Sequence, residues 1–157
     1  MMQFPNPCSD THALAIKPQL EQIEVALDWL RGLATQHEWP ERAVFGLILS
    51  ADEALTNIVA HAGNEDDVEE ATIRLICRHL PGEIVLRIED QGRFFDPTGA
   101  ESKPLAESLE DTDLGGHGLR LMRHYLKSLQ YARQDNRNVL TLVMSLSNGG
   151  KQADPLV

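Results

Sequence analysis

Glu53 and Asn57 stand four residues apart in a largely apolar stretch, and His61 follows after four more. In a helix this spacing puts the three side chains on one stripe. An amide oxygen is a hard, neutral ligand that suits Mg²⁺, and a glutamate one turn away can take a proton from a water or hydroxyl that attacks a phosphate. A solvated polar face is the alternative reading of this pair. For His61 we favour an interaction with the helix dipole over metal ligation, because no second His or Cys stands at ligand spacing.

Asp90 follows an alternating apolar run and precedes Gly92. A carboxylate at the end of a strand, beside a glycine that permits close backbone approach, can accept the exocyclic amine of adenine. The alternative is a simple turn of the chain.

A third segment is rich in glycine and leads into an apolar helical period: Gly115, Gly116, His117 and Gly118. Backbone amides at a helix N-terminus bind phosphate, although a flexible hinge would have the same composition. Lys103 and Arg120 are either additional charges near the phosphates or ordinary surface residues. The ordered occurrence of all three segments predicts a Mg-nucleotide site.

The composition indicates a single globular domain with an aliphatic core, since the chain has 157 residues and only 5% aromatics. Its net charge of −10 argues against nucleic acid or an anionic membrane as the main partner, whereas an acidic face could meet a basic protein. No apolar run approaches the ~20 residues that span a bilayer, and the N-terminus does not read as a signal peptide. We therefore expect a cytoplasmic protein with Cys8 and Cys77 as free thiols.

The elements that must position these residues follow from periodicity. The N-terminal half predicts an edge strand over 9–16, a helix with apolar residues from Leu20 to Ala34, a break at 36–39, and a second helix from Pro40 at N1 to Gly63. The C-terminal half predicts strands over 71–80 and 83–89 joined by Pro81-Gly82, a loop over 96–114, a helix over 118–129, strands over 130–134 and 139–146 joined by 135–138, and a tail over 147–157. This order predicts an α+β fold, a two-layer sandwich whose mixed, largely antiparallel sheet carries its helices on one face. The single domain spans 1–157, with its core at about 10–146.

The three segments resemble the sequence boxes of a known superfamily. Glu53-x-x-x-Asn57 is similar to the N box, Asp90-x-Gly92 to the first glycine box, and Gly116-x-Gly118-Leu119 to the second glycine box of the Bergerat-type (GHKL) ATP-binding fold. The compact size, Phe95-Asp96-Pro97 and Gly-Gly-His-Gly-Leu resemble the anti-sigma-factor serine kinases of bacterial partner switching. In one departure, Phe94 stands where many members carry a second glycine.

The resemblance implies a role for each matching position. Glu53 would be the catalytic base, Asn57 the Mg²⁺ ligand, and Asp90 the adenine acceptor, with residues 98–114 as the nucleotide lid. The implied ATP-binding set is Asn57, Ala60, His61, Asp90, Gly92, Phe95, Gly115, Gly116, His117, Gly118 and Leu119.

The implied function is that of a Mg-ATP-dependent serine kinase that phosphorylates an anti-anti-sigma (antagonist) protein and also acts as an anti-sigma factor. The resemblance further implies a sigma factor as a second partner, and dimerisation through the N-terminal strand or first helix. The alternative is a nucleotide-regulated binding module that sequesters a sigma factor or another partner with little kinase activity. An ATP-hydrolysing machine of the same superfamily is disfavoured, since we see no transducer domain in the chain.

Overall fold

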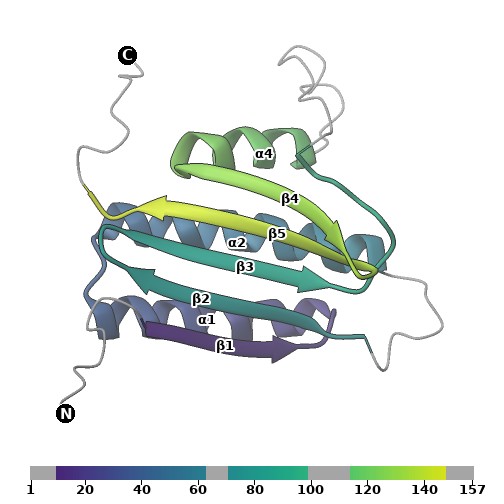
Figure 1. Ribbon diagram of the computed structural model, residues 1–157, viewed down its shortest axis with the longest axis horizontal. Coiled ribbons are helices and arrows are strands. Elements are labelled where there is room, and N and C mark those ends of the chain that lie inside the picture. Colours follow the sequence, from purple (N-terminus) through teal and green to yellow (C-terminus); the bar gives the residue numbers. More distant parts are fainter. Residues whose placement is uncertain (1–9, 63–70, 99–113, 148–157) are drawn as a thin grey trace.

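The computed structural model describes residues 10–62, 71–98 and 114–147. These residues form one five-stranded sheet, in the order β1-β2-β3-β5-β4, with helices packed against one of its faces (Figure 1). The elements are β1 (Asp10–Ile16), α1 (Leu20–His37), α2 (Glu41–Ala62), β2 (Ile73–Leu80), β3 (Glu83–Asp90), α4 (Leu114–Tyr125), β4 (Ser128–Gln134) and β5 (Arg137–Ser145). The α+β class and the single helical face are as predicted. Every described strand pair is antiparallel. We expected a mixed, largely antiparallel sheet, and the described sheet is antiparallel throughout.

Helix α1 continues one turn further than its apolar period required. Glu38 ends it in the left-handed conformation, with φ of 54°, and the Trp39 N–H reaches back to the Ala34 carbonyl at 3.0 Å. This is a Schellman cap, here built without glycine. The break therefore runs over residues 38–40, later along the chain than the predicted break at 36–39.

Helix α2 begins at Glu41, and the Pro40 carbonyl accepts its first hydrogen bond, from the Val44 N–H at 3.0 Å. Pro40 is thus the N-cap residue, one position earlier in helix numbering than the predicted N1. We expected no apolar run of membrane-spanning length, but among the described residues α2 is one helix that is long and apolar enough to cross a membrane by length and composition alone. Its place between the sheet, α1 and α4 accounts for that apolar character. Gly63, the predicted stop, lies outside the described residues.

The two hairpins differ in how closely the sequence located their turns. Gly82, with φ of +80°, closes β2 and β3 where Pro81-Gly82 was expected. The second turn is tighter than predicted: Gln134 pairs with Arg137, so only Asp135 and Asn136 form it. Both have positive φ, 49° and 64°, which defines a type I′ turn whose twist matches that of the strands. Arg137 and the residue after it consequently belong to β5.

The predicted helix over 118–129 is wrong at both ends. Helix α4 begins at Leu114, because the burial of Leu119 and Met122 against the core outweighs the low helix propensity of glycine. The chain leaves the helix after Tyr125, where the Lys127 N–H bonds to the Val143 carbonyl at 2.7 Å and starts the pairing with β5. Leu129 therefore lies in β4.

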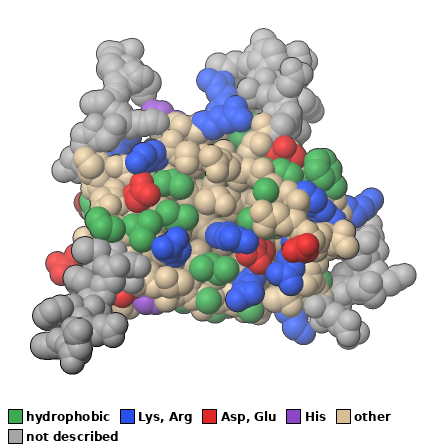
Figure 2. Space-filling model, viewed as in Figure 1, with side chains coloured by type: hydrophobic (Ala, Val, Ile, Leu, Met, Phe, Trp, Pro, Cys, Tyr) green, Lys and Arg blue, Asp and Glu red, His purple; other side chains and the backbone are tan. Residues whose placement is uncertain are grey.

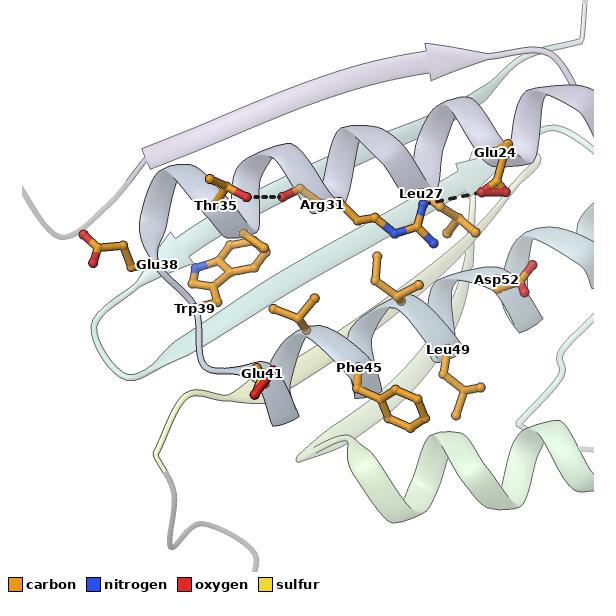
Figure 3. A pocket seen from close by; sticks show the side chains of 13 residues that line it. Glu24, Leu27, Arg31, Thr35, Glu38, Trp39, Glu41, Phe45, Leu49 and Asp52 are labelled. Carbon is orange, nitrogen blue, oxygen red and sulfur yellow. Dashed lines mark hydrogen bonds and ion pairs between the residues drawn. The ribbon is translucent and has the colours of Figure 1, made fainter.

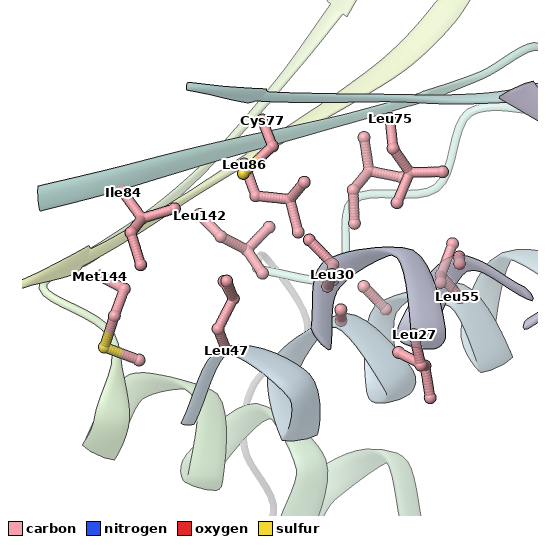
Figure 4. Close-up of a cluster of buried hydrophobic side chains, with 14 of the residues drawn as sticks. Leu27, Leu30, Leu47, Leu55, Leu75, Cys77, Ile84, Leu86, Leu142 and Met144 are labelled. Carbon is pink, nitrogen blue, oxygen red and sulfur yellow. The ribbon is translucent and has the colours of Figure 1, made fainter. Parts of the chain in front are cut away.

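The core lies between the sheet and the helices, and its alternation follows the predicted faces. Figure 4 shows side chains of β2, β3 and β5 meeting those of α1 and α2, all with at most 4% exposure: Leu27, Leu30, Leu47, Leu55, Leu75, Cys77, Ile84, Leu86, Leu142 and Met144. The opposite face of the sheet is exposed. It carries Arg74, Arg78 and Arg87, and Figure 2 shows basic side chains spread over this face.

Candidate functional site

Asp90 and Asn138 are direct cross-strand partners at one end of β3 and β5. Both side chains are buried, at 8% and 7% exposure, and the Asn138 Nδ2 donates to the Asp90 Oδ1 at 3.1 Å. The Gly92 N–H donates to the same oxygen at 2.9 Å. Among the described residues both hydrogen bonds of this carboxylate fall on Oδ1, so Oδ2 remains available as an acceptor. Two residues therefore hold the Asp90 carboxylate in place: Gly92, which sequence analysis identified, and Asn138, which it did not.

Asn138 connects four segments of the chain through one amide group. Its Nδ2 also donates to the Arg93 carbonyl at 2.8 Å, and its Oδ1 accepts from the Phe95 N–H at 3.3 Å and from the Tyr131 hydroxyl. Arg133 donates to this oxygen at 3.1 Å and to the Gly92 carbonyl at 2.8 Å. Buried polar groups that satisfy one another in this way fix a unique geometry. The loop after β3 is therefore tied to the β4–β5 hairpin.

Sequence analysis missed Asn138 because it was assigned to a turn, where asparagine needs no further explanation. The adjacent Asp135-Asn136 was the available signal. If Asp135-Asn136 is interpreted as a two-residue type I′ turn, Asn138 belongs to the strand that follows the turn. In the antiparallel sheet it then lies beside the end of β3.

Next to Asp90 the structure has a largely apolar cavity. Its lining residues come from α2, β3, the following loop, α4, β4 and β5: Ala54, Asn57, Ile58, Asp90, Phe95, Pro97, Leu119, Met122, Leu129, Tyr131, Asn138 and Leu140. Four of the predicted site residues, Asn57, Asp90, Phe95 and Leu119, thus line one cavity. Among the described lining residues Asp90 is the one carboxylate, and a buried carboxylate within apolar walls suits a flat heterocycle with an amino group.

His61 lies at the C-terminal end of α2, where we predicted that it interacts with the end of the helix. Its Nδ1 is 2.8 Å from the Asn57 carbonyl oxygen. Since a carbonyl can only accept, Nδ1 carries the proton in this contact. The ring also stacks on Phe95, with centroids 3.9 Å apart and planes 24° from parallel. His61 therefore caps the helix and supports one wall of the cavity.

Glu53 lies on α2, one turn before Asn57, and its carboxylate is directly against Gly118 of α4. A Cβ at position 118 would overlap the Glu53 side chain. Glycine is therefore required here by close approach, although it lies inside a helix. The N box and the second glycine box, 65 residues apart by their residue numbers, are in contact across the α2–α4 interface.

The remaining predicted residues fall in three places. Gly115, Gly116 and His117 lie in the first turn of α4, inside the helix and not before it. Ala60 and Arg120 are exposed on α2 and α4, and neither is among the residues that line the cavity. Phe94 is 65% exposed and packs edge-on against Tyr131, with centroids 5.7 Å apart. Lys103 and most of the predicted lid lie outside the described residues.

A second, larger groove of about 900 Å³ runs between α1 and α2 (Figure 3). It is lined by Glu24, Leu27, Arg31, Ala34, Thr35, Glu38, Trp39, Glu41, Val44, Phe45, Ile48, Leu49 and Asp52. Arg31 is the one basic residue among the described residues that line it, and it is paired with Glu24 at 3.4 Å and with Asp28 at 2.7 Å. The groove contains none of the predicted nucleotide residues, so the candidate site is the cavity at Asp90.

Comparison with known proteins agrees with this geometry. The histidine kinase-like ATPase domain family matches residues 16–144. The chain is 46% identical over 134 residues to the serine/threonine-protein kinase BtrW of Bordetella bronchiseptica, covering 85% of this chain and 93% of that protein. It is 25% identical over 148 residues to the serine-protein kinase RsbW of Bacillus subtilis, covering 93% and 91%.

A crystal structure of the RsbU and RsbW domains of Rv1364c from Mycobacterium tuberculosis has the same fold, with a TM-score of 0.61 at 14% identity. The likeness covers 85% of this chain and 32% of that one. With its sequence boxes brought together around Asp90 and the family match spanning nearly the whole described fold, this chain belongs to the histidine kinase-like ATPase domain family and is a homologue of the kinases BtrW and RsbW.

Proposed function

We propose that this protein is a Mg-ATP-dependent serine kinase that phosphorylates an anti-anti-sigma protein. The observation that carries the proposal is the convergence of a buried Asp90 carboxylate, the Asn57 amide and the Glu53 carboxylate where α2, β3 and α4 meet. The names of BtrW and RsbW support the protein serine/threonine kinase class.

The lining of the cavity at Asp90 suits the adenine of ATP, and its volume of about 30 Å³ means that the walls would have to move apart to admit the ring. The Oδ2 of Asp90 would accept the exocyclic amine, while Oδ1 stays bonded to Gly92 and Asn138. Leu119 and Met122 on one side and Leu140 on another supply apolar contact for the ring. The resemblance to the family's second glycine box assigns the phosphates to the first turn of α4, where helix amides are not yet hydrogen-bonded within the helix.

Asn57 and Glu53 would divide the chemistry between them. The Asn57 side-chain oxygen is suited to hold Mg²⁺, which would neutralise charge on the phosphoryl oxygens. Glu53 would take the proton from the serine hydroxyl as its oxygen attacks the γ-phosphorus and ADP leaves. Its contact with Gly118 supports this role, because Gly118 belongs to the proposed phosphate cradle.

The partners follow from the same homology. We propose that the unphosphorylated antagonist and a sigma factor compete for the protein, that the protein forms a homodimer, and that it works in the cytoplasm. Its net charge of −10 suits a basic protein partner better than nucleic acid.

Replacing Glu53 with alanine tests the proposed base. We expect Glu53→Ala to bind ATP with nearly unchanged affinity but to lose phosphate transfer by at least ~10²-fold, the scale of a general base. The assay follows radiolabelled γ-phosphate from ATP to a purified antagonist protein, with binding measured separately by calorimetry. Glu24→Ala, on the exposed face of α1, is the matched control and should transfer normally. Normal transfer by Glu53→Ala would refute the assignment of Glu53.

Replacing Asn57 with alanine tests the proposed metal ligand. Asn57→Ala should lose the increase in ATP affinity that Mg²⁺ confers on the unmodified protein, while affinity measured in EDTA should be the same for both. A Mg²⁺ effect that is equally large in the two proteins would contradict the role. If the unmodified protein captures its partner in an ATP-dependent way but transfers no phosphate, the regulatory binding module is the better description.

A further inference from the structure

A second group of side chains with coordinating atoms lies at the opposite end of the sheet from Asp90. His12 on β1 faces the helices, and His37 is the last residue of α1. Their Nε2 atoms are 3.2 Å apart, and the Asp10 Oδ2 is 3.9 Å from the His37 Nε2. All three potential ligand atoms lie within 4.8 Å of one another.

These distances are close to those of a metal site. In a tetrahedral zinc centre the bonds to histidine nitrogen and carboxylate oxygen are ~2.0–2.2 Å, so neighbouring ligand atoms lie roughly 3.3 Å apart. The pair of imidazoles already has this separation. The exposed Asp10 carboxylate is about 0.6 Å too far from the His37 Nε2 (3.9 Å against ~3.3 Å) and can approach by side-chain rotation.

The protonation of the cluster also suits a cation. Two ring nitrogens 3.2 Å apart cannot both carry a proton, so at least one lone pair points into the cluster. The neutral imidazole is the form that binds metal.

An aromatic wall orients the His37 ring. His37 stacks on His79, with centroids 4.2 Å apart and planes 17° from parallel, and on Trp39 at 5.9 Å and 13°. The Trp39 indole N–H donates to the His79 Nδ1 at 3.0 Å. That contact keeps the His79 Nδ1 unprotonated, which fixes its neutral tautomer. Rings held in this way lose little further freedom when a ligand binds.

We propose that Asp10, His12 and His37 bind a divalent transition-metal ion of the zinc type, with water in the fourth position. The two imidazoles are borderline ligands that favour Zn²⁺ over Mg²⁺ or Ca²⁺, and a carboxylate oxygen is also a common zinc ligand. The ion would connect β1, which is at the edge of the sheet, to the C-terminal end of α1. Its role would be structural, and it does not depend on the proposed kinase activity.

The test is calorimetric titration of the full chain, without a histidine tag and freed of metal by a chelator, with zinc chloride alone. We expect one site per chain, and an affinity at least about tenfold weaker in His12→Ala and in Asp10→Asn. His124→Ala, an exposed histidine on α4, is the matched control and should bind zinc like the unmodified protein.

Two further measurements separate ligation from folding. Cobalt bound at the site should give the visible absorption of a four-coordinate ion in the unmodified protein and in His124→Ala but not in His12→Ala. Saturating zinc should raise Tm in the first two proteins and not in His12→Ala, whose circular dichroism without metal should match that of the unmodified chain. Absence of zinc binding at micromolar concentrations, or equal affinity in His12→Ala, would overturn the proposal.

Discussion

The two ends of the same sheet hold polar clusters of opposite design. At one end Asp90 pairs in register with Asn138, and the groups there use their hydrogen-bonding capacity on one another. At the other end, where Asp10 pairs with His79, imidazole nitrogens face each other and a carboxylate without a full set of donors. The first cluster is a scaffold that presents one free oxygen to a cavity. The second presents coordinating atoms to an ion.

The difference follows from burial. Asp90 and Asn138 are less than a tenth exposed, and a buried polar group without a partner costs about 1–3 kcal/mol. In the histidine cluster the His37 side chain is also only 9% exposed, but the Asp10 side chain is 53% exposed, so its carboxylate can be left to solvent at little cost. The cluster whose buried Asn138 amide is fully hydrogen-bonded is therefore expected to dominate stability, whereas the open cluster is expected to respond to a ligand.

The strongest test of this comparison is the removal of the amide that unites the first cluster. Asn138→Ala leaves Arg93, Phe95 and Tyr131 without a shared partner and should lower the free energy of unfolding by about 2–4 kcal/mol. Chemical denaturation measures it. Asn136→Ala, in the exposed turn two residues away, should cost less than half as much. Equal losses would mean that the network does not stabilise the fold.

The next test removes the charge of the carboxylate and keeps its shape. Asp90→Asn should weaken ATP binding by about 10–100-fold, because an amide nitrogen can replace the oxygen that accepts the adenine amine. Asp135→Asn, at a left-handed turn position that suits asparagine, is the control and should bind normally. Calorimetry with ATP separates the two, and an unchanged affinity in Asp90→Asn would place the adenine elsewhere.

The smallest effect is expected at the histidine end. Trp39→Phe keeps a stacking ring but removes the donor to His79, and should cost about 1–2 kcal/mol of stability with no change in ATP affinity. Trp29→Phe is the control, since within the described residues that half-buried indole makes no hydrogen bond. If Trp39→Phe lowers the free energy of unfolding as much as Asn138→Ala does, the two ends of the sheet do not differ in their contribution to stability.

Sequence analysis located most elements because their signals are local. The alternation in β2 and β3 and the three-to-four spacing in α1 and α2 depend only on neighbours along the chain, and the core residues lie on the predicted faces. The errors fall where tertiary contacts compete with local preference. The glycines at 115, 116 and 118 belong to α4 because the helix buries Leu119 and Met122 against the core. Leu129 does not belong to α4, because it pairs with β5.

By itself the sequence determined the helices and strands, the aliphatic core, and the three boxes that carry the family resemblance. These are properties of spacing and residue type, which the chain contains before it folds. Only the tertiary structure decided which side chains meet: Asn138 beside Asp90 across 48 residues, Glu53 against Gly118, and His12 against His37 across 25 residues. Those contacts depend on strand register and helix packing, and neither can be predicted from a local sequence motif.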